Sequence, residues 1–463
     1  MGLSTPLVSR FNALRSYAGS YTWGPIVQLS RTAVVALLTR IEVGHLQITD
    51  VDGTVVSCGT AKRKDPQNEK WNDDAPAVEL SVHKDTFWVR LALFADMGFA
   101  ESYMLGEVSC PSLTSFFTLF ILNRAQLSNG STLTSTLSAK LSGFLRSTNT
   151  LQNARLNISA HYDISNDMFA AFLSPDMTYS CPIWLPTSHP KCAAETLEQA
   201  QAIKLQRFID NAHIKRSDHV LEIGTGWGSF AIAAVRATGC RVTSLTLSVE
   251  QKELAEQRIA DAGFTDQIEV LLCDYRALPV PKDTGKYDKV VSIEMLEAVG
   301  REYLTTYFEC VDKLLKKEGG IAVFQCITMP ETRYDAYSAS DDFIRRYIFP
   351  GGHLPTVSQL TSSITAGSRT TLIVDGIENI GPHYAKTLRL WRESFMAAFD
   401  ASIRPALLRE HDGMTKSDVE LFRRKWEYYF AYCEAGFRTK TLGDVIVTVG
   451  REGAVEMAER VPL

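Results

Sequence analysis

The stretch Val220-Leu221-Glu222-Ile223-Gly224-Thr225-Gly226-Trp227-Gly228-Ser229-Phe230 decides the fold of this chain. Its apolar residues predict a short buried strand, and the residues after Gly228 predict the start of a helix. Glycines at alternate positions allow a tight turn in which a ligand can lie against bare backbone. The helix that follows offers unpaired N–H groups and the positive end of its dipole. A glycine-rich turn without a ligand is the alternative.

The turn has the spacing Glu-x-Gly-x-Gly-x-Gly, which differs from the Gly-x-Gly-x-x-Gly of a dinucleotide site. It resembles the first motif of class I S-adenosylmethionine (SAM) methyltransferases. The resemblance implies that Gly224, Gly226 and Gly228 face the methionine part of SAM, with Glu222 near its amine.

The residues around the turn alternate between strand and helix patterns. We expect helices at 195–213, 229–237, 248–263 and 303–317, and strands at 219–223, 241–246, 267–272, 288–293 and 320–327. This alternation predicts an α/β fold with a mostly parallel, doubly wound sheet. Ligands of such sheets bind at the carboxyl ends of the strands, so the residues after each strand should converge on one crevice.

Composition excludes several classes of protein. The chain has 463 residues, 45% of them hydrophobic and 22% charged, as in a soluble globular protein. The net charge of −5 argues against a dedicated nucleic-acid binder. The nine cysteines form no Cys-x-x-Cys pair, so we expect no metal site and a reducing, cytoplasmic location. The first residues lack the charged-then-apolar layout of a signal peptide, and no apolar run reaches about 20 residues, so we expect neither a signal peptide nor a membrane span.

The N-terminal third is less regular. Residues 26–41 predict a core helix, with an interfacial helix as the alternative. Asp52-Gly53 predicts a hairpin turn, and residues 78–95 predict a strand and then a helix. Residues 125–150 are rich in Ser, Thr, Asn and Gly, as a linker is. We therefore expect a smaller N-terminal α+β domain at 1–124, a linker at 125–150 and the catalytic domain at 151–463.

The motifs together resemble the cyclopropane fatty acid synthases, which include the mycolic acid cyclopropane synthases, over about residues 155–450. The resemblance rests on motifs in the same order: Tyr162-Asp163, Asn166-Asp167, Tyr179-Ser180-Cys181, Glu222 to Gly228, Thr246-Leu247-Ser248, Asp274-Tyr275-Arg276, Glu297 with Val299-Gly300, Tyr347 to Gly352, and Tyr428-Tyr429 with Cys433 and Phe437. The run Glu294 to Gly300 is closest to the plant and fungal branch. Gly98 to Met104 is similar to the lipid-contacting N-terminal domain of full-length synthases.

The resemblance implies a reaction and its site. A cis double bond in an unsaturated phospholipid chain takes the methyl group of SAM, and the carbocation loses a proton and closes to a cyclopropane. A bound bicarbonate serves as the base in the family, surrounded here by Cys181, Glu297, Tyr384 and the backbone of Ile327. The implied partner is a lipid acyl chain at a membrane surface, reached by a peripheral enzyme, with a homodimer as a further option.

The acid–base residues carry alternatives. Glu297 is expected to accept the bicarbonate O–H, and a carboxylate at a helix N-terminus is the alternative. Bacterial synthases carry His where this chain has Gln325, and Gln donates through its amide but cannot titrate. For Cys433 we favour lining the substrate over plain core packing, and a nucleophile least.

The remaining predicted residues bind SAM or line the pocket. Tyr179 and Ser180 are expected to cover SAM, with Thr246, Leu247 and Gln251 in place of a ribose-binding acid. Asp274 lies where adenine usually sits, and a helix N-cap is its alternative. A carbocation needs π faces and a dry pocket, for which Tyr384, Trp391, Tyr429 and Phe437 are candidates; core packing is the alternative.

Three functions follow from these observations. The first is SAM-dependent cyclopropanation, or methylation, of unsaturated acyl chains. The second is methylation of another alkene, such as a sphingoid base or a secondary metabolite, without ring closure. The third is a lipid-binding scaffold that has lost catalysis, against which the intact glycines and Glu297 argue.

Overall fold

The computed structural model describes residues 19–60, 75–128, 165–280, 286–411 and 413–458. Contacts divide the chain into two compact units. The first unit comprises residues 1–163, 342–348 and 404–439, and the second comprises 164–341, 349–403 and 440–463. Two segments from the C-terminal half thus join the N-terminal region, which no sequence pattern had indicated. Most of the expected linker and the Tyr162-Asp163 motif lie outside the described residues.

The first unit is an α+β structure. Its sheet has the strand order β2-β1-β3-β4. The Asp52-Gly53 hairpin is confirmed, since β1 and β2 pair antiparallel on either side of it. The strands are β1 (Gly44–Thr49), β2 (Val55–Thr60), β3 (Ala77–Val82) and β4 (Val108–Ser109), and the helices are α2 (Gly19–Leu38), α3 (Thr86–Met104), α4 (Leu113–Leu122), α5 (Arg124–Ser128), α14 (Phe343–Tyr347), α17 (Arg404–Glu410) and α18 (Lys416–Arg438).

Aromatic side chains tie the C-terminal helix α18 to the rest of the first unit. Tyr428 packs edge-on against Phe117 of α4, with ring centroids 4.9 Å apart, and its ring is tilted against that of Phe343 of α14, at 4.4 Å. Phe99 of α3 stacks on Phe116 of α4 at 3.9 Å. These contacts explain why segments far apart in sequence form one unit, because aromatic rings bury large apolar areas.

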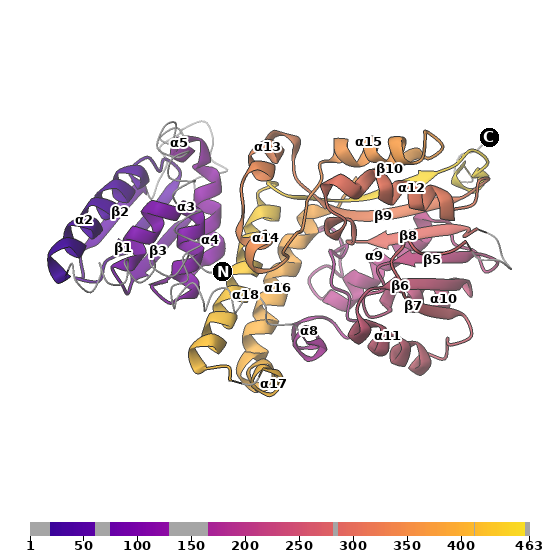
Figure 1. Cartoon of the computed structure of the whole chain (residues 1–463), viewed down its shortest axis with the longest axis horizontal. Helices are drawn as coiled ribbons and strands as arrows, with labels where there is room; N and C mark the ends of the chain where they lie inside the picture. The colour runs from indigo at the N-terminus through magenta and orange to yellow at the C-terminus, as the bar shows by residue number, and fades with distance from the viewer. Residues whose placement is uncertain (1–18, 61–74, 129–164, 281–285, 412, 459–463) are drawn as a thin grey trace, which may run out of the picture. The chain divides into compact units, whose positions relative to one another are not determined.

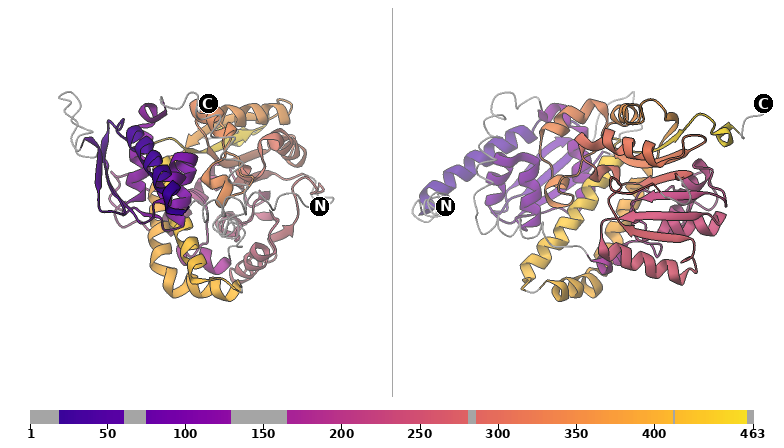
Figure 2. Two further views of the ribbon diagram at one scale, coloured as in Figure 1. Left: turned by 60° about the vertical axis from the view of Figure 1, so that its left-hand side comes forward. Right: turned by 45° about the vertical axis from the view of Figure 1, so that its right-hand side comes forward.

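The second unit is the predicted α/β domain (Figure 1). Its sheet has the order β10-β11-β9-β8-β5-β6-β7, in which β5 to β9 are parallel and β11 runs antiparallel to both of its neighbours, β9 and β10. The strands are β5 (His219–Ile223), β6 (Arg241–Thr246), β7 (Ile268–Leu272), β8 (Lys289–Ile293), β9 (Ile321–Thr328), β10 (Ile373–Asn379) and β11 (Gly443–Gly450). The expected strands and their boundaries agree with these to within one residue. The right-hand view of Figure 2 shows the same sheet from a second direction.

Helices cover both faces of this sheet. Helices α10 and α11 contact β6, while α12 and α15 contact each other. The helices of this unit are α8 (Asn166–Phe172), α9 (Leu197–Asn211), α10 (Ser229–Thr238), α11 (Val249–Asp261), α12 (Leu304–Leu314), α13 (Glu331–Ala339), α15 (Val357–Gly367) and α16 (Gly381–Ala398), the last followed by a π-helical turn (Phe399–Ile403). Short 3-10 turns lie at Leu296–Ala298, Arg301–Tyr303 and Val455–Ala458.

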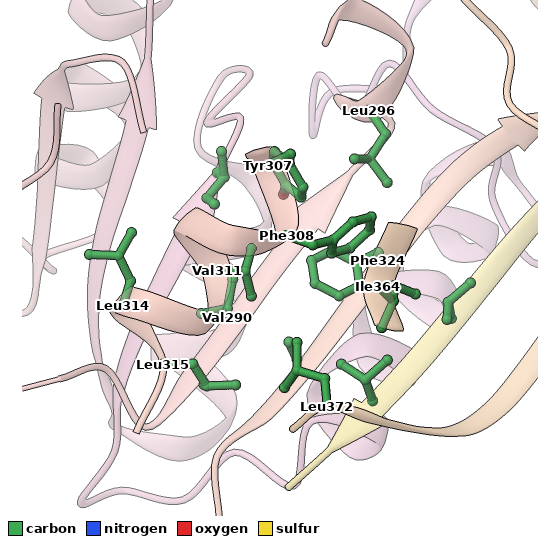
Figure 3. Close-up of a cluster of buried hydrophobic side chains, with 14 of the residues drawn as sticks. Val290, Leu296, Tyr307, Phe308, Val311, Leu314, Leu315, Phe324, Ile364 and Leu372 are labelled. Carbon is green, nitrogen blue, oxygen red and sulfur yellow. The ribbon is translucent and has the colours of Figure 1, made fainter. Parts of the chain in front are cut away.

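A hydrophobic core fixes β8 and β9 beneath α12 and α15 (Figure 3). Phe308 of α12 meets Phe324 of β9 edge-on, with ring centroids 5.3 Å apart, and Ile364 of α15 packs into the same cluster. All three side chains are buried. Because this core is close-packed, the loops that follow β8 and β9 start from a rigid base. No described helix is long and apolar enough to cross a membrane.

Candidate active site

The glycine turn after β5 has backbone angles that residues with a side chain rarely adopt. Gly224, Gly226 and Gly228 all have positive φ, of 105°, 52° and 83°. A Cβ built on Gly226 would meet nothing within 4 Å, so this face of the turn is open. Gly228 is the N-cap of α10. An open, side-chain-free turn at a helix N-terminus fits the methionine part of SAM.

Glu222 stands at the end of β5 with only 3% of its surface exposed. The Ser244 hydroxyl donates to its Oε2 at 2.5 Å. Burial raises the pKa of Glu222 to about 8, against the opposing effects of Ser244 and Lys204. A buried carboxyl group of this kind gains from a cationic partner such as an amine.

The other predicted SAM residues follow neighbouring strands. Thr246 donates to Gln251 at 3.1 Å, and Leu247 between them is 73% exposed. Asp274 accepts two side-chain bonds from Arg276, at 2.5 and 2.9 Å, which hold the Asp274 pKa below its usual value. Asp274 therefore pairs with an arginine and does not cap a described helix.

Tyr179 and Ser180 lie on the segment before α9. The Tyr179 ring lies 5.1 Å from that of Trp391. The Ser180 hydroxyl accepts from Lys204, a fully buried lysine, at 2.8 Å. Burial lowers the Lys204 pKa, although nearby carboxyl groups oppose this.

A second group of side chains converges on Glu294, directly after β8. The backbone N–H of Cys181 and the Gln325 amide both donate to Glu294 Oε1 at 2.7 Å. The Tyr384 hydroxyl donates to Glu294 Oε2 at 2.8 Å. Cys181, Gln325 and Tyr384 are buried, whereas Glu294 is only partly buried. We call Cys181, Gln325, Tyr384 and Glu294 the carboxylate cradle.

Glu297 lies beside the carboxylate cradle in a 3-10 turn. Its Oε1 accepts from the Ile327 N–H at 2.5 Å, and its buried Oε2 has no partner among the described residues. Burial first, and Glu294 next, raise the pKa of Glu297 to about 8. Glu297 is therefore mostly protonated at neutral pH and can donate as well as accept.

The structure brings together most of the predicted catalytic residues: Cys181, Glu297, Gln325, Ile327 and Tyr384 share this end of the sheet. The sequence analysis did not predict that Glu294 and Asp444 also belong to this group of acid–base residues. The position of Glu294 immediately after a buried strand could have indicated a site residue. Glu297, three residues later in the same motif, was predicted instead. Asp444 lies on β11, far along the chain, and only the strand pairing places it here.

Aromatic rings flank the same end of the sheet. Tyr384 and Trp391, both on α16, lie edge-on with centroids 5.8 Å apart. Both residues are buried. Trp391 and Tyr179 thus connect the predicted SAM residues to the carboxylate cradle.

Cys433, Tyr429 and Phe437 lie on α18, which belongs to the first unit, whereas the residues above belong to the second. Burial raises the pKa of the Cys433 thiol, and Asp342 adds to this. A neutral thiol is a poor nucleophile, which agrees with the preference for a lining role. The function of these three residues stays a prediction. The described residues contain no cluster that would hold a metal ion.

The parallel sheet, the glycine turn and the acid at the end of β5 define the class I SAM-dependent methyltransferases. Solved structures share the fold: coclaurine N-methyltransferase bound to SAH aligns with a TM-score of 0.56 at 19% identity, over 77% of this chain and 99% of that one. The mycolic acid cyclopropane synthase CmaA1, complexed with SAH and CTAB, aligns with a TM-score of 0.53 at 26% identity, over 64% and 98%.

The sequence comparisons identify the family. The profile of the family described as mycolic acid cyclopropane synthetase matches residues 149–446. Tuberculostearic acid methyltransferase UfaA1 of Mycobacterium tuberculosis is 39% identical over 438 residues, 93% of each chain. Cyclopropane-fatty-acyl-phospholipid synthase of Escherichia coli is 32% identical over 400 residues, 84% of this chain and 92% of that one. The chain belongs to the mycolic acid cyclopropane synthetase family and is a SAM-dependent methyltransferase.

Proposed function

We propose that the enzyme transfers a one-carbon unit from SAM to the cis double bond of an unsaturated phospholipid acyl chain and closes it to a cyclopropane. When bound, SAM supplies an electrophilic methyl group. The alkene π electrons form the new carbon–carbon bond as the carbon–sulfur bond breaks, which leaves a cation on the second alkene carbon. Loss of a proton from the added methyl group closes the ring. The observation that carries the proposal is a carboxylate held by three donors beside Glu297.

The relatives support this class of reaction. The E. coli relative is named as a cyclopropane synthase of fatty-acyl phospholipids, and the solved CmaA1 structure belongs to a cyclopropane synthase. Each acts on an acyl chain, so an acyl chain is the substrate that we propose here.

Bicarbonate does not fit the residues of this chain. Two of the donors expected to surround it, the Cys181 N–H and Tyr384, donate to Glu294, as does Gln325 at the position of the bacterial His. The third expected donor, the Ile327 N–H, donates to Glu297, the expected acceptor of the bicarbonate O–H. Because every expected donor already serves a protein carboxylate, we derive no step through bicarbonate.

We propose that Glu294 is the base in its place. Glu294 is less buried than the other members of the carboxylate cradle, which suits a residue that must meet substrate. The residue has a φ of +48°, a left-handed conformation that costs a non-glycine residue roughly 1–3 kcal/mol. Strained backbone of this kind clusters at active sites, where the side chain is kept for its chemistry.

The surrounding side chains suit a carbocation. The rings of Tyr384 and Trp391 offer π faces, which attract cations electrostatically. Their burial keeps water from trapping the cation as an alcohol. Burial raises the pKa of Glu294, against its hydrogen bonds and Lys204, which makes its ionised carboxylate a stronger base. In this proposal the Glu294 carboxylate attracts the cation and then takes its proton.

The proposed function is tested with the purified full chain, SAM and vesicles of an unsaturated phospholipid in bicarbonate-free buffer. We expect acyl chains heavier by one CH₂ whose proton spectrum shows cyclopropane and no new vinyl signals. Adding bicarbonate should leave the rate unchanged. No mass gain on any lipid, or a rate that depends on bicarbonate, would contradict the proposal.

A methyl-branched or methylene product is the second candidate, and one observation favours it. UfaA1, which aligns over 93% of this chain, is named as a methyltransferase. A sphingolipid C9-methyltransferase of Candida albicans is also 33% identical, over 52% of this chain. In that case the proton leaves a neighbouring chain carbon, which gives a methyl-branched alkene, or a hydride shifts to the cationic carbon and the proton leaves the added methyl group, which gives a methylene branch. Either product shows new vinyl signals in the same experiment.

We also propose that the first unit contacts the membrane surface. Helix α2 exposes Ile26, Leu29 and Leu37, and its only charged side chain, Arg31, pairs with Asp50. An apolar, nearly uncharged helix face is compatible with a lipid surface. Co-sedimentation with anionic and neutral vesicles tests this, with Leu29→Asp expected to weaken binding.

A further inference from the structure

Asp444 is a buried carboxyl group beside the carboxylate cradle. It has 0% exposure and lies near the start of β11, the strand between β9 and β10. Its backbone C=O accepts from the Ile380 N–H at 2.7 Å, where α16 begins. The Asp444 side chain contacts Gln325 on β9 and Glu294 directly after β8.

One amide joins the Asp444 and Glu294 side chains. The Gln325 Nε2 group donates to Glu294 Oε1 at 2.7 Å and to Asp444 Oδ2 at 2.9 Å. The two carboxyl groups are also hydrogen-bonded to each other. Asp444 Oδ1 is buried and receives no donor from any described residue.

Two carboxyl groups in such contact must share a proton. Two carboxylates offer only acceptors, and two like charges away from water repel strongly. The geometry also decides which group keeps the proton. Glu294 has three other donors, in Cys181, Gln325 and Tyr384, and two of them bond at 2.7 Å. Among the described residues, Asp444 has the Gln325 amide and the weakly donating Cys181 thiol, and it is the more deeply buried of the two carboxyl groups.

We propose that Asp444 is a positioning residue for the base: it remains protonated at neutral pH and donates that proton in a hydrogen bond to the Glu294 carboxylate, which stays ionised and fixed in direction. This proposal rests on the proposed role of Glu294. After Glu294 takes a substrate proton, the pair holds two protons, and one returns to solvent before the next turnover.

The charged groups that face Asp444 favour this state. Burial, and then Glu294, hold the Asp444 pKa well above its ordinary value, and Glu297 acts in the same direction. Lys204 on α9 is the cation that faces the pair, and its own pKa is lowered by burial. Cys181 and Cys326 are neutral thiols there, because burial raises the pKa of each. Tyr384 faces the pair from α16 as a donor.

The first test measures thermal unfolding of the full chain between pH 4 and pH 8 without substrate. The variants are Asp444→Asn, which keeps the size and a donor, and the control Thr448→Val on the same face of β11. The folded wild type keeps the Asp444 proton above pH 4, while the unfolded chain loses it, so its stability falls as pH rises. The Asn side chain of Asp444→Asn does not titrate, so this position adds no pH dependence to the stability of the variant.

We therefore expect Asp444→Asn to melt several degrees above the wild type at pH 8, with the gain shrinking toward zero at pH 4. The control should show no such pH dependence. A lower melting temperature than the wild type at pH 8 would show that Asp444 is an ionised, stabilised carboxylate, and would overturn the proposal.

The second test measures kcat against pH for Asp444→Asn and Asp444→Leu. Asparagine still donates to Glu294, so kcat should stay within about threefold of the wild type. Leucine removes the donor, so kcat should fall at least 30-fold and its acidic limb should move up by at least one pH unit. Equal loss in both variants would overturn the positioning role.

The two tests separate this inference from the proposed function. A chain that transfers no methyl group, yet gains stability in Asp444→Asn, would refute the proposed function and support the shared proton. A chain that is active but loses stability in Asp444→Asn would refute the shared proton alone.

Discussion

The glycine turn and the carboxylate cradle lie at the carboxyl end of one sheet, yet they arise in different ways. The turn is a continuous stretch in which glycines adopt backbone angles that other residues avoid. The cradle collects side chains from before α9, after β8, on β9 and on α16, with Asp444 joining from β11. A local motif thus builds the cofactor end, while tertiary contacts build the end that handles the proton.

The largest expected effect falls on the cradle. Glu294→Gln keeps the shape of the side chain but removes its ability to take a proton, so kcat should fall roughly 100- to 10,000-fold. SAM affinity, measured by calorimetry, should stay unchanged. Glu256→Gln, at an exposed pair with Lys252, is the control. Full activity of Glu294→Gln would show that Glu294 is not the base.

A change at the turn should act on the cofactor instead. Gly224→Val forces a β-branched residue to a φ of 105°, which costs about 1–3 kcal/mol or distorts the turn. We expect SAM affinity to fall at least tenfold, as read by calorimetry. Gly263→Val, at a φ of 76° after α11, carries similar strain and should leave SAM affinity unchanged. Equal effects of both variants would contradict a SAM-binding turn.

The pH dependence of cofactor binding sharpens the same contrast. Glu222 has a pKa raised to about 8, so it is protonated below that pH and must lose the proton to pair with an amine. SAM affinity should fall by up to tenfold per pH unit below pH 8. Glu222→Gln should abolish this dependence, while Glu269→Gln, exposed on β7, should keep it. A wild-type SAM affinity that does not change with pH would show that Glu222 does not bind the SAM amine.

We expect the smallest effect on catalysis from a substitution in the hydrophobic core between α12, α15 and the sheet. Phe308→Leu removes part of a buried ring that packs on Phe324, and should lower the free energy of unfolding by about 1–2 kcal/mol. Denaturant titration measures this loss. Neither kcat nor SAM affinity should change by more than about twofold. A selective loss of kcat would mean that the core sets the position of the cradle more tightly than its packing indicates.

Much of the second unit follows from local patterns. The strands at 219–223 and 241–246 were predicted to the residue, because short apolar runs between turn signals have few alternatives. The hairpin at Asp52-Gly53 was predicted for the same kind of reason. The sequence did not predict that residues 404–439 belong to the first unit. The aromatic residues of α18 do not indicate by themselves which other rings they pack against.

The sequence by itself determined the parallel sheet, the glycine turn and the methyltransferase class, because backbone preferences and hydrophobic periodicity are written in consecutive residues. Only the tertiary structure decided that Glu294 accepts the donors expected around bicarbonate, and that Gln325 links it to Asp444. The physical reason is that the protonation and direction of a carboxyl group depend on burial and on neighbouring donors. Strand pairing supplies those neighbours from distant parts of the chain.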